Sequence, residues 1–206
     1  MKDPLTEIFT WKNIVAHFYG QPGSFKTTFL IQLIQVKLKN RNSKIYLIDP
    51  TGEFPIIRFQ PIKHLLKNLV IFQPKTIQEE ALLLDDLQVK ILEEESILFI
   101  DDVFRHSNLN RKEEIHLNSY IAGLISSISK TLAFPVIVTN QARFFNNYFQ
   151  PFLQNLTLYY FHWHFLFEKG IKPNTLNISL FSKEKFVIQY EYSLNSEGFI
   201  IIPNLS

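Results

Sequence analysis

Short apolar stretches alternate along the chain with longer stretches in which apolar side chains recur every three or four residues. The apolar stretches lie at residues 14–20, 44–49, 69–73, 96–102 and 134–141. Each has the length of a buried strand and is bounded by polar or turn-forming residues. The helical spacing fills the intervals between them. Strands that alternate with helices predict a mostly parallel sheet with helices on both faces.

The helical segments carry their own signals. In residues 26–40, Leu30, Leu33 and Ile34 share one face. Thr76, with Glu79 three residues later, forms a capping box that opens a second helix. That helix is expected to end at the acidic run 93–95, because carboxylates oppose the macrodipole at a helix C-terminus. A third helix is expected from about Arg111, with its apolar face made by Leu117, Ile121, Leu124, Ile125, Ile128 and Leu132.

The last third of the chain follows a different pattern. Residues 156–167, 175–181 and 185–194 are predicted to be strands with no helix between them. Turn-forming residues separate these stretches and suit hairpins. We therefore expect an antiparallel extension of the parallel sheet. Residues 1–206 are predicted to form one α/β domain.

Composition narrows the class of protein. The chain of 206 residues is 46% hydrophobic and 19% charged, as globular proteins are. It has no cysteine, which excludes disulfides and thiolate metal sites. The formal net charge of +2 is too small to argue for nucleic-acid binding by itself. No signal-peptide core or membrane-spanning run is visible, so we expect a soluble, cytoplasmic protein without membrane contacts.

The segment after the first predicted strand has the character of a phosphate-binding loop. Small residues allow backbone N–H groups to close on phosphates at a helix N-terminus. A lysine then reaches the β- and γ-phosphates, and a hydroxyl holds Mg²⁺. We predict that ATP is bound, with Mg²⁺, by Gly20, Gln21, Pro22, Gly23, Ser24, Phe25, Lys26, Thr27 and Thr28.

One residue departs from the usual loop, because Phe25 stands where a glycine normally precedes the lysine. This residue begins the helix, so we expect it to have a negative φ, which a side chain tolerates. Nucleotide binding should then survive if the ring points away from the phosphates. Hydrolysis depends more strictly on geometry, since it needs a water held in line by a carboxylate.

Carboxylates follow two of the predicted strands. Asp101 stands at the tip of the strand 96–102, where it can hold Mg²⁺-bound water beside the loop, so Thr27 and Asp101 are the predicted metal residues. Asp102 and Glu53 are the two candidates for positioning the attacking water. The alternatives are that Glu53 is a solvated turn residue and that Asp102 caps a helix.

With these motifs the chain resembles the RecA-type recombinase core, and within it the archaeal RadA/RadB recombinases and their shorter paralogues. "YGQPGSFKT" is similar to their Walker A segment, "FIDDVFR" to their Walker B strand, and "VIVTNQ" to their strand that ends in a glutamine. The resemblance extends over roughly residues 14 to 200. It implies a RecA-like P-loop NTPase fold, and it implies that Gln141 is a catalytic residue that senses the γ-phosphate.

The departures from this family are informative as well. The position of the family's catalytic glutamate falls on Thr51, and the loop after "TNQ" lacks the usual glycine pair. The family's N-terminal DNA-binding domain and its phenylalanine–alanine polymerisation motif are expected to be missing. These departures argue against fast turnover and against self-assembled filaments.

Two loops are candidates for contact with single-stranded DNA, as the resemblance implies. The first, residues 104–112, carries Arg105, Arg111 and Lys112, and the second, residues 142–152, carries Arg143, Phe144 and Phe145. Aromatic rings beside a cation can stack on bases. The alternative, which we favour for the second loop because it has one cation, is that its aromatics fill the core or a subunit contact. His162 and His164 are expected to share one face of a strand, a spacing that can bind metal, but packed sheet histidines are the favoured interpretation.

The sequence thus predicts an ATP-binding recombinase paralogue with weak ATPase that assists homologous recombination and DNA repair. Its expected partners are ATP or ADP, single-stranded DNA, and a recombinase or other paralogue subunit. The alternative is a nucleotide-gated subunit that hydrolyses nothing and acts through a partner protein.

Overall fold

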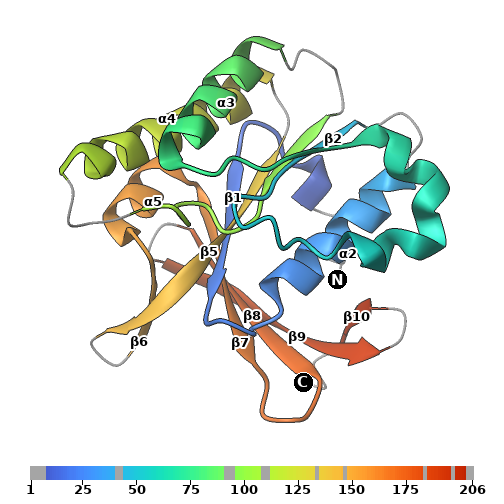
Figure 1. Ribbon diagram of the computed structural model, residues 1–206. Coiled ribbons are helices and arrows are strands. Elements are labelled where there is room, and N and C mark those ends of the chain that lie inside the picture. The colour runs from blue at the N-terminus through green and yellow to red at the C-terminus, as the bar shows by residue number, and fades with distance from the viewer. Residues whose placement is uncertain are drawn as a thin grey trace.

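A computed structural model describes residues 8–39, 44–90, 96–107, 112–132, 135–145, 148–182, 185–195 and 198–202. Within this part of the chain, ten strands form one sheet, in the order β10-β9-β8-β7-β1-β5-β4-β2-β3, with β6 paired to β5 alone. The sequence predicts the presence of these layers but not the order of the strands. That order places the first strand at the centre of the sheet (Figure 1).

The parallel half of the sheet matches the predicted strands. It consists of β1 (Val15–Gly20), β2 (Ile45–Ile48), β3 (Leu69–Phe72), β4 (Ile97–Ile100) and β5 (Val136–Phe145). All pairs among these strands are parallel, so their carboxyl ends meet at one edge. The predicted α/β class with a mostly parallel sheet is therefore confirmed.

Helices cover both faces of this half. On one face, α2 (Lys26–Leu38) and the kinked 3₁₀ segment η2 (Ile56–Asn68) pack on alternate residues of the strands, such as Phe18, Leu47 and Phe99. On the other face, α3 (Ile77–Lys90) and α4 (Lys112–Leu132) pack on the residues between them. The predicted capping box is present, since Glu79 N–H donates to Thr76 Oγ1 at 3.1 Å. The predicted end of α3 at 93–95 lies outside the described residues.

The prediction for residues 156–167 was only half right. Residues 154–160 form a short helix, α5 (Gln154–Tyr160), and the strand begins after it as β7 (Trp163–Lys169). The aromatic and β-branched residues of this segment favour a strand. The segment is nevertheless helical, because the helix buries Thr157 fully and packs against α4. His162 precedes β7, so the expectation that it shares a strand face with His164 is wrong.

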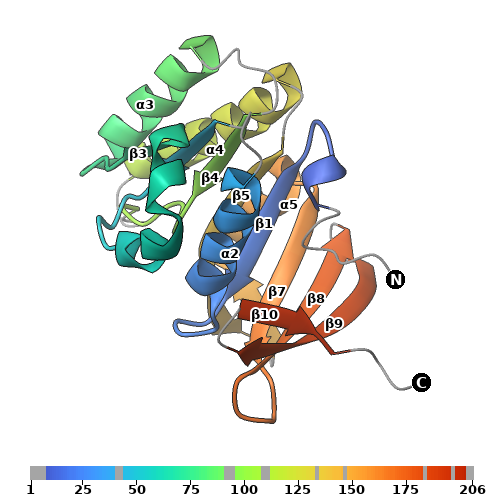
Figure 2. The ribbon, with the colours of Figure 1, turned by 90° about the vertical axis from the view of Figure 1, so that its right-hand side faces the viewer.

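The rest of the C-terminal third is the expected antiparallel extension. It consists of β8 (Thr175–Ser182), β9 (Lys185–Asn195) and β10 (Gly198–Ile201), which follow β7 as successive antiparallel pairs. Figure 2 shows these strands spreading away from the helices. Phe199 of β10 donates its N–H to Gln32 Oε1 at 2.7 Å and accepts from Gln32 Nε2 at 3.0 Å. The end of the sheet is therefore fastened to α2.

The segment 142–152, expected to be a loop, is largely a two-stranded ribbon. β5 continues past the sheet to Phe145 and pairs with β6 (Tyr148–Pro151), with Phe144 opposite Phe149 and Arg143 opposite Gln150. Figure 1 shows this ribbon projecting beyond the sheet. Alternation of apolar and polar residues was absent in this segment, so the strand signal was hidden.

A short 3₁₀ turn, η1 (Ile8–Thr10), precedes β1 and places Ile8 in the apolar core between the sheet and α2. Among the helices that the structure describes, none has both the length and the apolar character needed to cross a bilayer.

Candidate nucleotide-binding site

The predicted phosphate loop follows the carboxyl end of β1 and is tightly folded. A Cβ at Gly20 would lie 2.4 Å from the backbone oxygen of Phe167 and 2.6 Å from Ser24 Oγ, so no larger residue fits. Ser24 N–H donates to Gln21 O at 3.1 Å, and Gly23 has a φ of 75°. Small residues are therefore required here by close contact and by backbone conformation.

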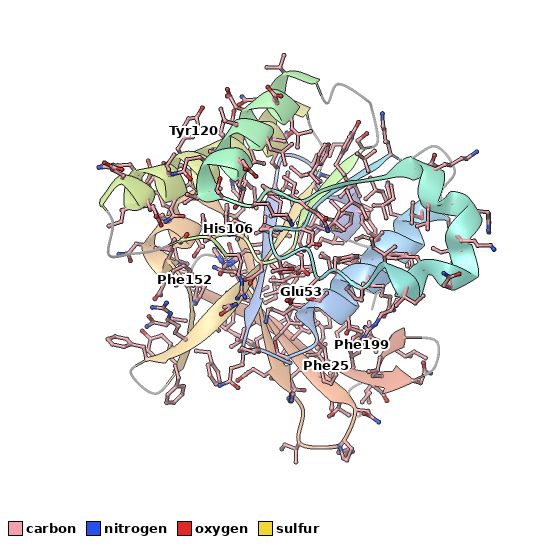
Figure 3. All side chains as sticks on the ribbon, in the orientation of Figure 1. Phe25, Glu53, His106, Tyr120, Phe152 and Phe199 are labelled. Atoms are coloured by element: carbon pink, nitrogen blue, oxygen red, sulfur yellow. The ribbon has the colours of Figure 1, made fainter. Side chains whose placement is uncertain are left out.

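Phe25 does not have the negative φ that we expected. Its φ of 67° and ψ of 11° are left-handed. The chain must turn sharply between the loop and α2, and a glycine usually stands at this point because the left-handed region costs another residue about 1 kcal/mol. The Phe25 carbonyl still accepts the first helical bond, from Phe29 N–H at 2.9 Å. Its ring packs against Phe199, with centroids 5.8 Å apart (Figure 3).

Lys26 lies inside the curve of the loop. Its Nζ donates to Gly20 O at 2.8 Å and to Gln21 O at 2.9 Å. Burial lowers the pKa of Lys26 to about 8, although the nearby carboxylates of Asp102 and Asp101 oppose this change. A bound phosphate would favour the charged ammonium further, so the site is suited to an anion that replaces the loop carbonyls as the partner of Nζ.

Thr27 and Asp101, the predicted metal residues, lie together. Thr27 Oγ1 donates to the two Asp101 oxygens at 3.3 and 3.2 Å, and Thr139 Oγ1 donates to Asp101 Oδ1 at 2.6 Å. Burial raises the pKa of Asp101 in spite of these hydrogen bonds. A hydroxyl and a carboxylate held this close provide oxygen ligands of the kind that Mg²⁺ prefers.

We predict that Asp101→Ala leaves the fold intact and removes the Mg²⁺ dependence of ATP binding. The carboxylate would hold the metal or its water, while the loop amides and Lys26 would still attract the phosphates. Titrations of ATP at several Mg²⁺ concentrations measure this. Asp86→Ala, on α3 away from the loop, is the matched control. A folded Asp101→Ala protein with unchanged magnesium dependence would contradict the assignment.

Asp102 and Gln141 also meet at this edge. Gln141 Nε2 donates to Asp102 Oδ2 at 3.0 Å, and Arg105 Nη1 lies 3.7 Å from the same oxygen. Burial raises the pKa of Asp102, and the contacts with Gln141 and Arg105 lower it. Asp102 has a φ of 63° within a turn that is not helical, so the alternative of a helix-capping acid is wrong.

Glu53 is not drawn into this cluster. The buried carboxylate of Asp49 organises its turn by accepting from Thr51 Oγ1 at 2.7 Å and from Gly52 N–H at 3.0 Å. Glu53 is exposed, and its N–H donates to Thr51 Oγ1 at 3.1 Å.

The predicted nucleic-acid residues are only partly described. Arg111 lies outside the described residues, as does the side chain of Lys112, whose backbone begins α4. Arg143 places its guanidinium 4.4 Å from the ring centroid of Phe152. Phe144 and Phe145 are 63% and 59% exposed, so these two rings do not fill the core.

The structure adds residues that sequence reasoning missed. Glu80, in the first turn of α3, is fully buried, and neither carboxylate oxygen has a hydrogen-bond partner among the described residues. Burial, reinforced by the charge of Asp102, raises the pKa of Glu80 to about 8. An acid in the first turn of a helix is ordinary, so the sequence gives no signal of this burial.

Two further contacts were also unforeseen. His164 meets His17 across β7 and β1, with their Nδ1 atoms 3.0 Å apart. Burial lowers the pKa of His17 and brings that of His164 to about 4, which favours a neutral pair. No metal-binding group of three or more ligands occurs among the described residues.

A second lysine stands beside the phosphate loop. Lys169 Nζ lies 3.6 Å from the position that a Cβ on Gly23 would take.

A phosphate-binding loop at the end of the central strand β1, with Asp101 and Asp102 facing it from the end of β4, two strands away in the parallel sheet, is the arrangement of a RecA-like P-loop fold. No family model matches the chain. The other two comparisons with known proteins agree with this fold. A protein from Methanococcus maripaludis strain C7, named DNA repair and recombination protein RadB, is 28% identical over an alignment of 152 residues that covers 68% of this chain and 69% of the relative.

A protein with the same name from Methanosphaera stadtmanae is 26% identical over an alignment of 140 residues that covers 63% of this chain and 60% of that protein. The crystal structure of the RadB recombinase superimposes with a TM-score of 0.75 and 20% identity, covering 93% of this chain and 91% of that one. The expected resemblance to the RecA-type recombinase core, and within it to the archaeal RadA/RadB recombinases, is therefore confirmed.

Proposed function

We propose that this protein is a RadB-like recombinase paralogue that binds ATP with Mg²⁺, hydrolyses it slowly, and assists homologous recombination and DNA repair. Lys26 would contact the β- and γ-phosphates, Thr27 and Asp101 would hold the metal, and Gln141 would respond to the γ-phosphate. The observation that carries the proposal is the meeting of the loop, Asp101 and Gln141 at one sheet edge, in a chain similar to RadB proteins.

Slow turnover is part of the proposal because, among the described residues, neither candidate carboxylate is free and well placed for the attacking water. Asp102 is the better candidate, since it lies against Gln141, whereas Glu53 is exposed. Thr51, at the position of the family's catalytic glutamate, is engaged with Asp49. The left-handed Phe25 also places a ring beside the lysine, where small displacements of the phosphates are costly for catalysis.

The same observations support a second candidate, a nucleotide-gated subunit that does not hydrolyse ATP. Asp102 Oδ2 accepts from Gln141 Nε2 at 3.0 Å and lies 3.7 Å from Arg105 Nη1. A carboxylate oxygen engaged by these two partners is less available to accept a proton from a water molecule. In this alternative, ATP would alter the position of Gln141 and of the ribbon that continues from it, and a partner protein would respond to that change.

ATP turnover with and without single-stranded DNA separates the two candidates. We expect slow turnover that the oligonucleotide stimulates. We expect Arg143→Ala to lower the affinity for the oligonucleotide, and with it the stimulation of turnover, because one phosphate contact is lost. Phe145→Ala should cost ~1–3 kcal/mol of DNA binding if the exposed ring stacks on a base.

Lys63→Ala, an exposed lysine on η2, is the matched control for the loss of one positive charge. If Arg143→Ala and Lys63→Ala behave alike at low salt, the ribbon is not the DNA-binding surface. ATP binding without turnover in any condition would favour the gated subunit over the recombinase.

A further inference from the structure

A cavity of about 520 Å³ lies between the β5–β6 ribbon and the sheet, and none of the predicted loop residues 20–28 is among its lining. We call it the ribbon pocket and define it by the side chains that carry its chemistry, which are Tyr19, Phe144, Tyr148, Phe149, Glu168 and Phe181. Its size falls within the range of about 300–1,000 Å³ found for sites that bind small ligands.

The ribbon pocket is separate from the hollow beside Asp102. That hollow, of about 130 Å³, is lined by Asp102, Gln141, Arg105 and Arg143. Arg143 stacks on Phe152 there and does not line the ribbon pocket. The two cavities therefore differ in chemistry, one polar with two cations and one aromatic.

The ribbon pocket has one sign of charge. Glu168 supplies a carboxylate, and no lysine or arginine lines the cavity among the described residues. His164 also lines it, but burial brings the pKa of this histidine to about 4, so it adds no positive charge near neutral pH. Burial and the nearby charge of Glu168 raise the pKa of Tyr19, so the phenol and the carboxylate are close enough to interact electrostatically.

Aromatic rings complete the walls. Phe144 and Phe149 pack against each other with centroids 5.2 Å apart, and Phe144 and Tyr148 remain 63% and 51% exposed at the rim. An exposed aromatic rim around a pocket is typical of a protein contact surface. A carboxylate among aromatic faces attracts cations, and the planar guanidinium suits such faces better than an ammonium does.

A nucleic-acid base fits these observations less well. A base brings its phosphate with it, and a phosphate near Glu168 would be repelled without a neighbouring cation in the lining. We propose that the ribbon pocket is the docking site for an arginine side chain presented by an exposed segment of a partner protein, with Glu168 pairing the guanidinium and the rings contacting its faces. This proposal does not depend on whether ATP is hydrolysed.

The test uses the whole protein and a pentapeptide, acetyl-Gly-Ser-Arg-Ser-Gly-amide, with a second peptide in which neutral citrulline replaces arginine. Titrations are followed by the NMR signals of the aromatic side chains. The arginine peptide is expected to shift Tyr148 and Phe149 saturably and to bind about 5- to 10-fold more tightly than the citrulline peptide. Glu168→Gln should remove that preference, and Phe149→Ala should weaken both peptides.

Glu113→Gln, the same charge change at an exposed position on α4, is the matched control and should keep the preference. Melting temperatures and ATP affinity verify that the variants are folded. Equal affinity for the two peptides, or no saturable shift with either, would overturn the proposal. It would also be overturned if a short oligothymidylate shifted the same signals and bound more tightly to Glu168→Gln, since that result indicates a site for bases.

Discussion

Replacing Glu80 with glutamine is expected to raise the free energy of unfolding by about 4 kcal/mol at pH 8 and by less than about 1 kcal/mol at pH 5. Glu80 is fully buried, its oxygens have no partner among the described residues, and its pKa is raised from 4.5 to about 8. Glutamine has nearly the same shape and carries no charge, so it removes the cost of taking up a proton at this position when the chain folds.

The direction of the pH dependence follows from proton binding. Between pH 4.5 and 8 the folded wild-type protein keeps the Glu80 proton while the unfolded chain loses it. Folding therefore takes up a proton, and the stability of the wild type falls as the pH rises through this window. Denaturant unfolding of both proteins at several pH values gives the difference, in which the contributions of other groups cancel.

Glu79→Gln is the matched control, because Glu79 is exposed on the same turn of α3. Its effect on stability should be small and nearly independent of pH. If Glu80→Gln and Glu79→Gln gave parallel curves of stability against pH, Glu80 would be ionised in the folded protein, and the buried neutral acid would be excluded.

The sequence predicted those parts of the fold that depend on local pattern. The buried strands before Gly20 and before Asp101 are continuous apolar runs, and parallel strands end at the same edge, so the meeting of Thr27 with Asp101 followed from the topology class. The resemblance to the recombinase core implied a role for Gln141 at this edge, but the contact of Gln141 with Asp102 at 3.0 Å was not predicted.

What the sequence could not predict depends on contacts between distant segments. Residues 154–160 have strand-forming side chains but form a helix where they pack on α4. Glu80 looks like an ordinary first-turn acid, and only the packing of α3 buries it. The His17–His164 contact requires β7 to pair with β1, across a sequence separation of 147 residues. Propensity and periodicity are local and carry none of this information.

Phe25 combines a local and a distant effect, and two substitutions separate them. Phe25→Ala should lower the free energy of unfolding by about 2–3 kcal/mol, because it removes a half-buried ring that packs on Phe199 and on the apolar core between the sheet and α2. Phe25→Gly removes the same ring, but it also relieves the left-handed backbone, so it should lie about 1 kcal/mol above the alanine variant.

The same pair tests what the phenylalanine does to catalysis. The loop amides and Lys26 remain in both variants, so ATP affinity should be similar to that of the wild type. Turnover should rise in Phe25→Gly, which restores the residue typical of the loop and frees the phosphates from the neighbouring ring. Thermal melts and steady-state ATPase measure both effects. A glycine variant less stable than the alanine variant would refute the backbone argument, and one that turns over no faster would show that Phe25 does not limit hydrolysis.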